Sequence, residues 1–208
     1  GQSVVIVVDG YGGEDGAYTL NISNAAMSFG APTTAGDLVI TEIMQNPDVI
    51  SDPQGEWFEI VNTTSSTLNL NGCVVHDVGS GSPPRPNSFD ISTDLLVRPG
   101  EYSVLARTSD PGFTPNFDWP GSTALANGDD EIIIECGPSG SPTEIDRVEY
   151  DGGPMFPGPT GASMSLSDSA TDSVMNDVGA NWCEAALFLT PYDGDNRATP
   201  GFANPDCP

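Results

Sequence analysis

Lysine is absent from this chain of 208 residues, and the basic side chains that it does have are few. All five are arginines, namely Arg85, Arg98, Arg107, Arg147 and Arg197. Against them stand 30 acidic residues, which gives a formal net charge of −25 at pH 7. Such a field repels nucleic acids and anionic lipids, so we exclude nucleic acid as a partner. Three interpretations of the acidity stay open: solubility or tolerance of high salt, Ca²⁺ binding by some carboxylates, and recognition of a basic partner.

Long hydrophobic runs and clear helical patterns are also missing. No apolar run approaches the roughly 18 residues of a transmembrane helix, so no membrane span is expected. The segment 168–182 comes nearest to a helical pattern, but its polar content and Gly179 argue against a helix. Glycine (24 residues) and proline (19 residues) are scattered along the chain, which is typical of many short strands joined by turns.

The sequence also lacks a recognisable catalytic motif. The single histidine, His76, stands beside Asp77, but the sequence has no G-x-S-x-G motif to supply an activated serine. Glu56 and Glu59 flank two aromatic residues. Because they are three residues apart on a predicted strand, their side chains should lie on opposite faces of the sheet, where they cannot act together as an acid–base pair. We therefore assign no catalytic residue and expect no enzyme activity.

The four cysteines are Cys73, Cys136, Cys183 and Cys207, without a C-x-x-C pair. Zinc sites usually space their ligands closely and often add histidines, so disulfides are the better interpretation. An even number of cysteines favours two disulfides and an oxidising, extracellular location. Three connectivities are possible, and we favour Cys73–Cys136 and Cys183–Cys207. The first pair lies in or beside strand-like runs, and the second would hold the penultimate residue in place.

The chain opens with a predicted β-hairpin over residues 1–22. Val4–Val8 is a β-branched apolar run, Ala17–Ile22 alternates, and a glycine-rich turn lies between them. A two-stranded hairpin alone is only marginally stable, so it needs a surface to pack on. The residues expected to make that contact are apolar: Val4, Val5, Ile6, Val7, Val8, Tyr18, Leu20 and Ile22.

Further strands follow every 8 to 15 residues, with turn signals between them. The expected strand regions are 38–44, 56–62, 66–77, 87–92, 95–107, 129–137, 144–152 and 162–167. This spacing predicts an all-β protein built as an antiparallel β-sandwich.

The order of these segments resembles the lamin tail domain of the bacterial, secreted type over residues 37–204. The similarity rests on the segments "GDLVITEIMQNP", "GEWFEIVNTTSSTLNLNGCVV", "LVRPGEYSVLAR", "LANGDDEIII" with "IDRVEYDG", and, in the closing stretch, "TGASMSLS", "NDVGANWCEA" and "GDNRATPGFANP". The resemblance implies an immunoglobulin-like sandwich, in which Glu59 and Asn62 have a structural, hydrogen-bonding role. Cys73 replaces an aromatic residue that often follows the Leu-x-Gly step of that family.

The hairpin has its own resemblance, because "VVIVVDGYGGEDGAYTLNI" is similar to the last two strands of a pre-peptidase C-terminal domain of secreted bacterial proteins. The expected organisation is a hairpin (1–22), a linker (23–36) and a lamin-tail-like sandwich (37–208).

Two loops are candidates for binding. Asp193, Asp195 and Asn196 have the D-x-[DN] composition of a Ca²⁺ loop, although the same residues also make ordinary tight turns. No cofactor is required, and Ca²⁺ is the one that the composition allows. The loop 111–122 carries Phe113, Phe117 and Trp119, and either presents an aromatic contact surface or covers one end of the sandwich.

These observations favour a non-enzymatic extracellular module, and the hairpin suggests a subunit of a surface fibre. The partners expected are other copies of the chain or other surface proteins, joined when the hairpin adds to a neighbour's sheet edge. Two alternatives stay open: an accessory domain of a secreted hydrolase or nuclease, and a Ca²⁺-dependent carbohydrate or surface binder.

Overall fold

The computed structural model describes residues 28–79, 87–119, 121, 123–186 and 196–208. The predicted hairpin, with its expected contact residues from Val4 to Ile22, lies outside this part of the chain. The strands are β1 (Leu38–Met44), β2 (Trp57–Asn62), β3 (Leu68–Asn69), β4 (Val74–His76), β5 (Ser88–Asp90), β6 (Leu96–Val97), β7 (Tyr102–Ala106), β8 (Phe117–Asp118), β9 (Asp129–Cys136), β10 (Thr143–Asp151), β11 (Met164–Leu166) and β12 (Trp182–Glu184). The helical elements are α1 (Asp52–Gly55) and the 3₁₀ turns η2 (Asp168–Ala170) and η3 (Gly179–Asn181).

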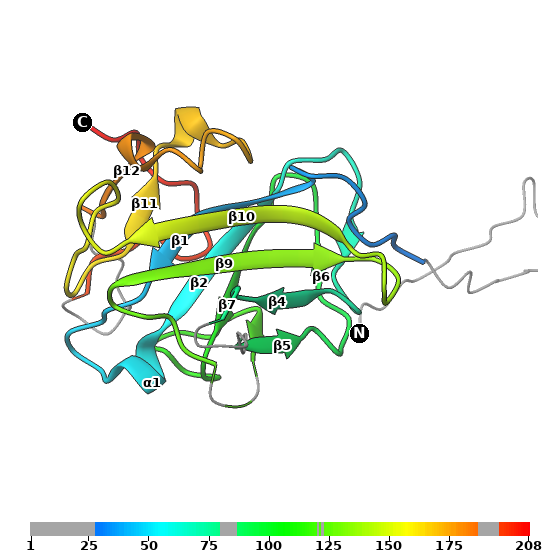
Figure 1. The fold of residues 1–208 in the computed structure, drawn as a ribbon, viewed down its shortest axis with the longest axis horizontal. Helices are drawn as coiled ribbons and strands as arrows, with labels where there is room; N and C mark the ends of the chain where they lie inside the picture. Colours follow the sequence, from blue (N-terminus) through cyan, green and yellow to red (C-terminus); the bar gives the residue numbers. More distant parts are fainter. Residues whose placement is uncertain (1–27, 80–86, 120, 122, 187–195) are drawn as a thin grey trace, which may run out of the picture.

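Two sheets lie face to face, with β9 and β10 crossing in front of β1, β2 and β7 (Figure 1). The larger sheet has the order β12-β11-β1-β2-β7-β8, and the smaller has the order β10-β9-β4-β5. Their pairings are antiparallel except for the short β7–β8 pair. The expected all-β antiparallel sandwich is therefore confirmed.

The core lies between the inner faces of the sheets. Ile40 and Phe58 of the larger sheet are fully buried in one cluster with Ile132, Ile134 and Val148 of the smaller sheet. Removing these β-branched and aromatic side chains from water supplies most of the stabilisation of such a sandwich, at about 25 cal/mol per Å² of apolar surface.

One end of this core is closed by aromatic rings from the 111–119 segment. Trp119 is 2% exposed and stacks on Phe89, with ring centroids 5.0 Å apart. Phe113 packs edge-on against Trp57 at 5.8 Å. Trp119 therefore closes one end of the core, and Phe113 packs on Trp57 at the outer face of the larger sheet, which favours the interpretation that the loop covers the sandwich.

Both disulfides have the pairing expected from the sequence. Cys73 and Cys136 join the start of β4 to the end of β9 within the smaller sheet. Cys183 of β12 binds Cys207 near the end of the chain.

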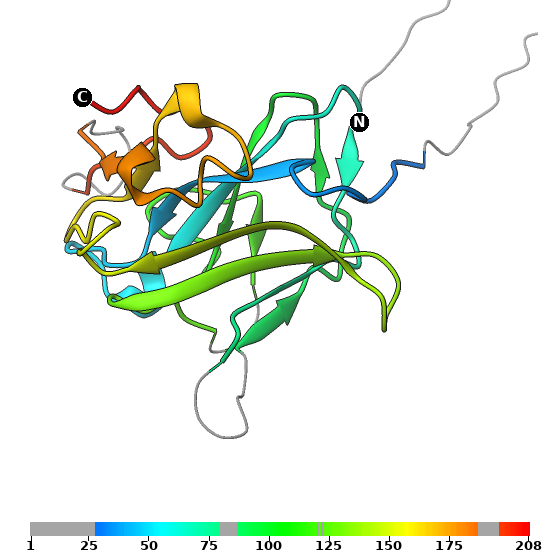
Figure 2. The ribbon, with the colours of Figure 1, turned by 45° about the horizontal axis from the view of Figure 1, so that its top comes forward.

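The outer face of the larger sheet is also covered. Residues after β10 gather at one end of the sandwich, on the side of β1 (Figure 2). Ala198, from this last part of the chain, packs in a second buried cluster with Met44, Trp57 and Val104. This covering explains why all seven residues of β1 are buried although their sequence alternates between apolar and polar.

The sequence did not predict β8 or β12, each of which has three or fewer residues. The segment 168–182 forms two 3₁₀ turns and a bend between them, in agreement with the expectation that it is no regular helix.

Candidate functional site

The most polar part of the interior is a pair of glutamates on the outer face of the larger sheet. Glu42 of β1 and Glu59 of β2 are paired across the two strands, and both are 0% exposed. A bulge in β1 between Ile40 and Glu42 sets this register, because two residues of β1 advance for one of β2. Two carboxylates are thus enclosed side by side where an alternating strand would present them to solvent.

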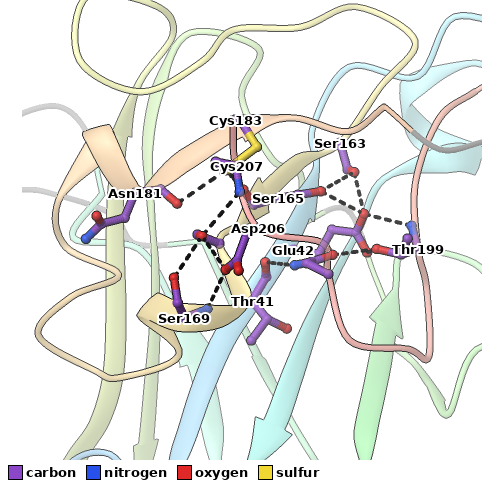
Figure 3. The surroundings of a disulfide bond; sticks show 12 residues. Thr41, Glu42, Ser163, Ser165, Ser169, Asn181, Cys183, Thr199, Asp206 and Cys207 are labelled. Carbon is purple, nitrogen blue, oxygen red and sulfur yellow. Dashed lines mark hydrogen bonds between the residues drawn. A yellow bond between two sulfur atoms is a disulfide. The ribbon is translucent and has the colours of Figure 1, made fainter.

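The Glu42 carboxylate is surrounded by hydroxyl and backbone donors (Figure 3). Its Oε1 accepts hydrogen bonds from the Ser163 hydroxyl at 2.5 Å, the Ser165 hydroxyl at 3.2 Å and the Thr199 backbone N–H at 2.9 Å. The two serines come from the β11 region, next to β1 in the sheet. These donors lower the pKa of Glu42, but desolvation outweighs them and raises it to about 7.

Proton counting around Thr199 also favours a protonated Glu42. The Thr199 hydroxyl has a single hydrogen and lies near two oxygens, Glu42 Oε2 at 3.2 Å and Asn204 Oδ1. Asn204 uses its Nδ2 to donate to the Thr41 carbonyl, so its Oδ1 faces Thr199 as an acceptor. The hydroxyl therefore donates to one of these two oxygens at a time, and when Asn204 accepts the hydrogen a protonated Glu42 Oε2 can donate to Thr199 instead.

Glu59 holds the same C-terminal segment from the neighbouring strand. Its Oε2 accepts the backbone N–H of Gly201 at 2.5 Å, and its Oε1 accepts the Thr41 hydroxyl at 2.9 Å. Burial, and then the neighbouring charge of Glu42, raise the pKa of Glu59 well above its usual value. The two glutamates therefore fasten the segment 199–201 to the sheet through its backbone.

The last residues are fixed next to this site. The Asp206 carboxylate accepts the Ser167 hydroxyl and the Ser169 N–H, both at 2.9 Å, which lowers its pKa. The Cys183–Cys207 bond then ties the chain end to β12 (Figure 3).

A third buried carboxylate, Asp146, lies where the two sheets meet. Its Oδ2 accepts the Ile40 N–H of β1 at 2.6 Å and the Asn176 side-chain N–H at 2.8 Å. Desolvation raises its pKa to about 7. A bulge in β10 between Glu144 and Asp146 positions it there. Asp146 thus connects the smaller sheet to β1 and to the turn around Asn176.

Glu56 and Glu59 bind different partners. Glu56 Oε2 lies 2.8 Å from Arg107 Nη1 and accepts the Leu125 N–H at 3.1 Å, away from the C-terminal segment. Burial raises the pKa of Glu56 to about 7 in spite of the arginine. These two carboxylates share no partner that would make them an acid–base pair.

Asn62, which the family resemblance placed in a structural role, uses both ends of its amide. Nδ2 donates to the carbonyls of Ser66 and Val97 at 2.8 Å, and Oδ1 accepts from the backbone and side chain of Thr64. Asn62 therefore shapes the turn after β2.

The other candidates from the sequence are not brought together. His76 lies on β4, where Nδ1 is 2.8 Å from the Asp77 carbonyl and Nε2 is 3.5 Å from Glu135. The apolar hollow beside it has a volume of only about 20 Å³. Of the proposed Ca²⁺ loop, Asp193 and Asp195 lie outside the described residues, while Asn196 is 1% exposed and accepts the Asp48 N–H at 3.0 Å. The Ca²⁺ site stays a prediction.

Glu42 and Asp146 were missed by sequence reasoning. The available signal was an acidic residue within each predicted strand, a single one in "LVITEIM" and one of three in "EIDRVEY". A strand with one solvent-facing side gives the same pattern, so only knowledge of the covering segment distinguishes the two cases.

Comparison with known proteins adds one family. Residues 31–152 match the model of the lamin tail domain, whereas no curated protein matches the chain. The match runs from just before β1 to just after the end of β10. Glu42, Glu59 and Asp146 lie inside it, whereas their partners Ser163, Asn176, Thr199 and Gly201 lie beyond it. Because the match covers more than half of the sequence, the chain belongs to the lamin tail domain family, whose members are immunoglobulin-like β-sandwiches.

Proposed function

We propose that this chain is a non-enzymatic protein-interaction module of the extracellular space, and that it serves as a subunit of a surface fibre. The lamin tail domain is a non-catalytic, immunoglobulin-like family, which supports the first part. The observation that carries it is the use of the buried carboxylates. Glu42, Glu59 and Asp146 bind the chain's own N–H and hydroxyl groups and lie at most 3% exposed, so a substrate has no access to them.

The proposed location rests on the two disulfides, which indicate an oxidising environment. No helix among the described residues is long and apolar enough to cross a membrane.

The fibre part of the proposal comes from the apolar hairpin that the sequence predicts for residues 1–22. In this proposal it adds as a strand to a sheet edge of the next copy, which is a head-to-tail contact and builds a filament when repeated.

Deletion of residues 1–22 tests the fibre. Sedimentation velocity and negative-stain electron microscopy of the full chain are expected to show filaments or large assemblies, and the 23–208 chain is expected to be monomeric. A chain carrying Val5→Ser and Val7→Ser should lose assembly as well, whereas the control Ser3→Ala should not. Equal assembly of the full and shortened chains would contradict the fibre. Turnover of a polysaccharide, ester or nucleic acid substrate by the purified chain would contradict the non-enzymatic role.

A further inference from the structure

β10 is the longest strand at a sheet edge in the described structure. It has nine residues and borders only β9, whereas the other outer strands of the two main sheets, β5, β8 and β12, have two or three residues. Natural proteins shield such edges with charged side chains or cover them, because an open edge accepts another strand. The first half of β10 is partly covered, since the Gly36 N–H donates to the Ile145 carbonyl and Ile40 binds Asp146. The half from Arg147 to Asp151 is the part left for a partner.

A hollow runs beside this edge, between β10 and the loops that follow it. One part, of about 380 Å³, is lined by Arg147, Glu149, Asp151, Met155, Phe156 and Asp177. An adjoining part of about 150 Å³ shares Arg147 and Asp177 and reaches Glu144, Asp146 and Val174. We call the two parts together the β10 groove. One wall lies within the family match, and the other is formed by residues beyond it.

The β10 groove has more acidic than basic groups. Arg147, its one basic residue, is bound to Glu144 at 2.8 Å and to Glu149 at 2.6 Å, so its charge is already compensated. Asp177 lies across the groove, and the ion pairs of the described residues do not include one between Asp177 and Arg147. Burial, and then the charge of Glu149, raise the pKa of Asp177, while Arg147 lowers it less. The groove therefore has a negative potential even with its arginine in place.

A buried carboxyl with an incomplete set of partners also borders the groove. Asp146, 3% exposed, lines the smaller part of the groove, and its Oδ1 has no hydrogen-bond partner in the described structure. Buried carboxylate oxygens are normally paired. No three acidic, histidine or cysteine side chains of the described residues are arranged to hold a metal ion, so the geometry favours an organic cation over Ca²⁺.

The chain itself offers no suitable side chain. It contains no lysine, and four of its five arginines already form ion pairs with glutamates. These pairs are Arg98 with Glu101, Arg107 with Glu56, Arg147 with both Glu144 and Glu149, and Arg197 with Glu184. The fifth, Arg85, lies outside the described residues. The rim of the groove is apolar, because Met155 is 73% exposed and Val174 is 69% exposed. Such a rim suits the methylene stem of a long cationic side chain, which packs on apolar surface while its charged end meets a carboxylate.

The geometry points to the β10 groove as the docking site for an extended, lysine-containing segment of a different protein. The segment lies along the outer edge of Arg147–Asp151, and its ammonium group lies between Glu149 and Asp177. This partner is distinct from the copies that build the proposed fibre, and the inference rests only on the coarser statement that the chain is an interaction module.

A blocked peptide of alternating lysine and valine, Ac-TKVKVKVT-NH₂, serves as the probe for the full chain, with a glutamine-for-lysine peptide as its control. Isothermal titration calorimetry at low salt measures affinity, and NMR shift changes locate the peptide. We expect the changes to fall on residues 144–151 and 174–178. Glu149→Gln with Asp177→Asn should weaken binding by about tenfold. The matched control is Asp90→Asn, on β5 at the opposite edge of the same sheet, which should leave affinity unchanged.

Three results would overturn the assignment. Equal weakening by Asp90→Asn would show attraction to the overall charge alone. No binding of the lysine peptide at 1 mM would exclude the docking site. A change in self-association of the Glu149→Gln/Asp177→Asn chain, measured by sedimentation without peptide, would make the groove a contact between copies. The fibre proposal is judged separately by the 1–22 deletion, so the two fail independently.

Discussion

Glu42 and Glu59 lie opposite each other on β1 and β2 and share one function, which is to hold the backbone of the segment 199–201. Glu42 accepts the N–H of Thr199, and Glu59 accepts that of Gly201. Like charges this close and this deeply buried do not both ionise at neutral pH, so the pair retains a proton. Burial raises the pKa of both carboxyls, that of Glu42 to about 7 and that of Glu59 well above its usual value, so the two groups share the proton.

The first prediction concerns the protonation state of Glu42 in the folded protein. Glu42→Gln keeps the shape of the protonated side chain and can donate an N–H to the Thr199 hydroxyl, so its stability at pH 7 should be within about 1 kcal/mol of the parent. Glu42→Ala leaves the Thr199 N–H and the Ser163 hydroxyl without their acceptor and opens a cavity, and should cost about 2–4 kcal/mol. Urea denaturation monitored by tryptophan fluorescence measures both. Equal losses in the two variants would contradict a protonated Glu42.

The second prediction is a stability that falls as the pH rises. The pKa of Glu42 is raised from 4.5 to about 7 and that of Asp146 from 3.8 to about 7. Between those values the folded state binds protons that the unfolded state has released, so the free energy of unfolding decreases with pH. The slope is about 1.4 kcal/mol per pH unit for each group. Denaturation curves at pH 5, 6, 7 and 8 measure it.

Repulsion within a chain of charge −25 acts in the same direction, so a comparison of variants is needed. Glu42→Gln should flatten the decline, whereas the exposed control Asp90→Asn should leave its slope unchanged. A stability that is constant or rises from pH 5 to 8 would show that these carboxyls are ionised in the folded state.

The sequence predicted the sheets better than it predicted the interior carboxylates. Runs such as 129–137 and 144–152 became β9 and β10 within a residue or two, because β-branched alternation and glycine turns act locally. Cys207 was assigned to Cys183 because a penultimate residue needs an anchor, and the structure has that bond.

The local sequence pattern could not predict that the outer face of the larger sheet is covered. Glu42 reads as a solvent-facing strand position, and it is buried because Ser163 and Thr199, more than 100 residues away in sequence, lie against it. The groove beside β10 has the same origin, since Asp177 reaches it from a segment without regular structure. Contacts between distant segments, and the bulges at Ile40 and Glu144, are set by tertiary packing.

The third prediction compares the two disulfides. In the loop-entropy model the 63-residue separation of Cys73 and Cys136 stabilises by about 4 kcal/mol, and the 24-residue separation of Cys183 and Cys207 by about 3 kcal/mol. Cys183→Ser with Cys207→Ser should therefore cost less in global stability. It should also loosen the chain end, because hydrogen bonds of Asp206 and of the residue 207 N–H to Ser167 and Ser169 then hold it without a covalent bond. Carboxypeptidase digestion followed by mass spectrometry should remove residues after 204 from this variant and not from Cys73→Ser with Cys136→Ser. Identical digestion of both would show that the bond does not hold the terminus.

The fourth prediction uses a matched pair of glycines. A Cβ at Gly179 would lie 2.4 Å from the Met155 carbonyl oxygen, where the loop before β11 meets η3. That atom belongs to the backbone and cannot move aside alone, so Gly179→Ala should cost about 1–3 kcal/mol. A Cβ at Gly128 meets no atom within 4 Å, and neither glycine has a left-handed φ. Gly128→Ala should therefore be neutral or slightly stabilising, since it restricts only the unfolded chain. Thermal unfolding of the two variants measures the difference. If Gly179→Ala matched Gly128→Ala, the 153–156 loop would not be packed against η3, and the far wall of the β10 groove would lose its support.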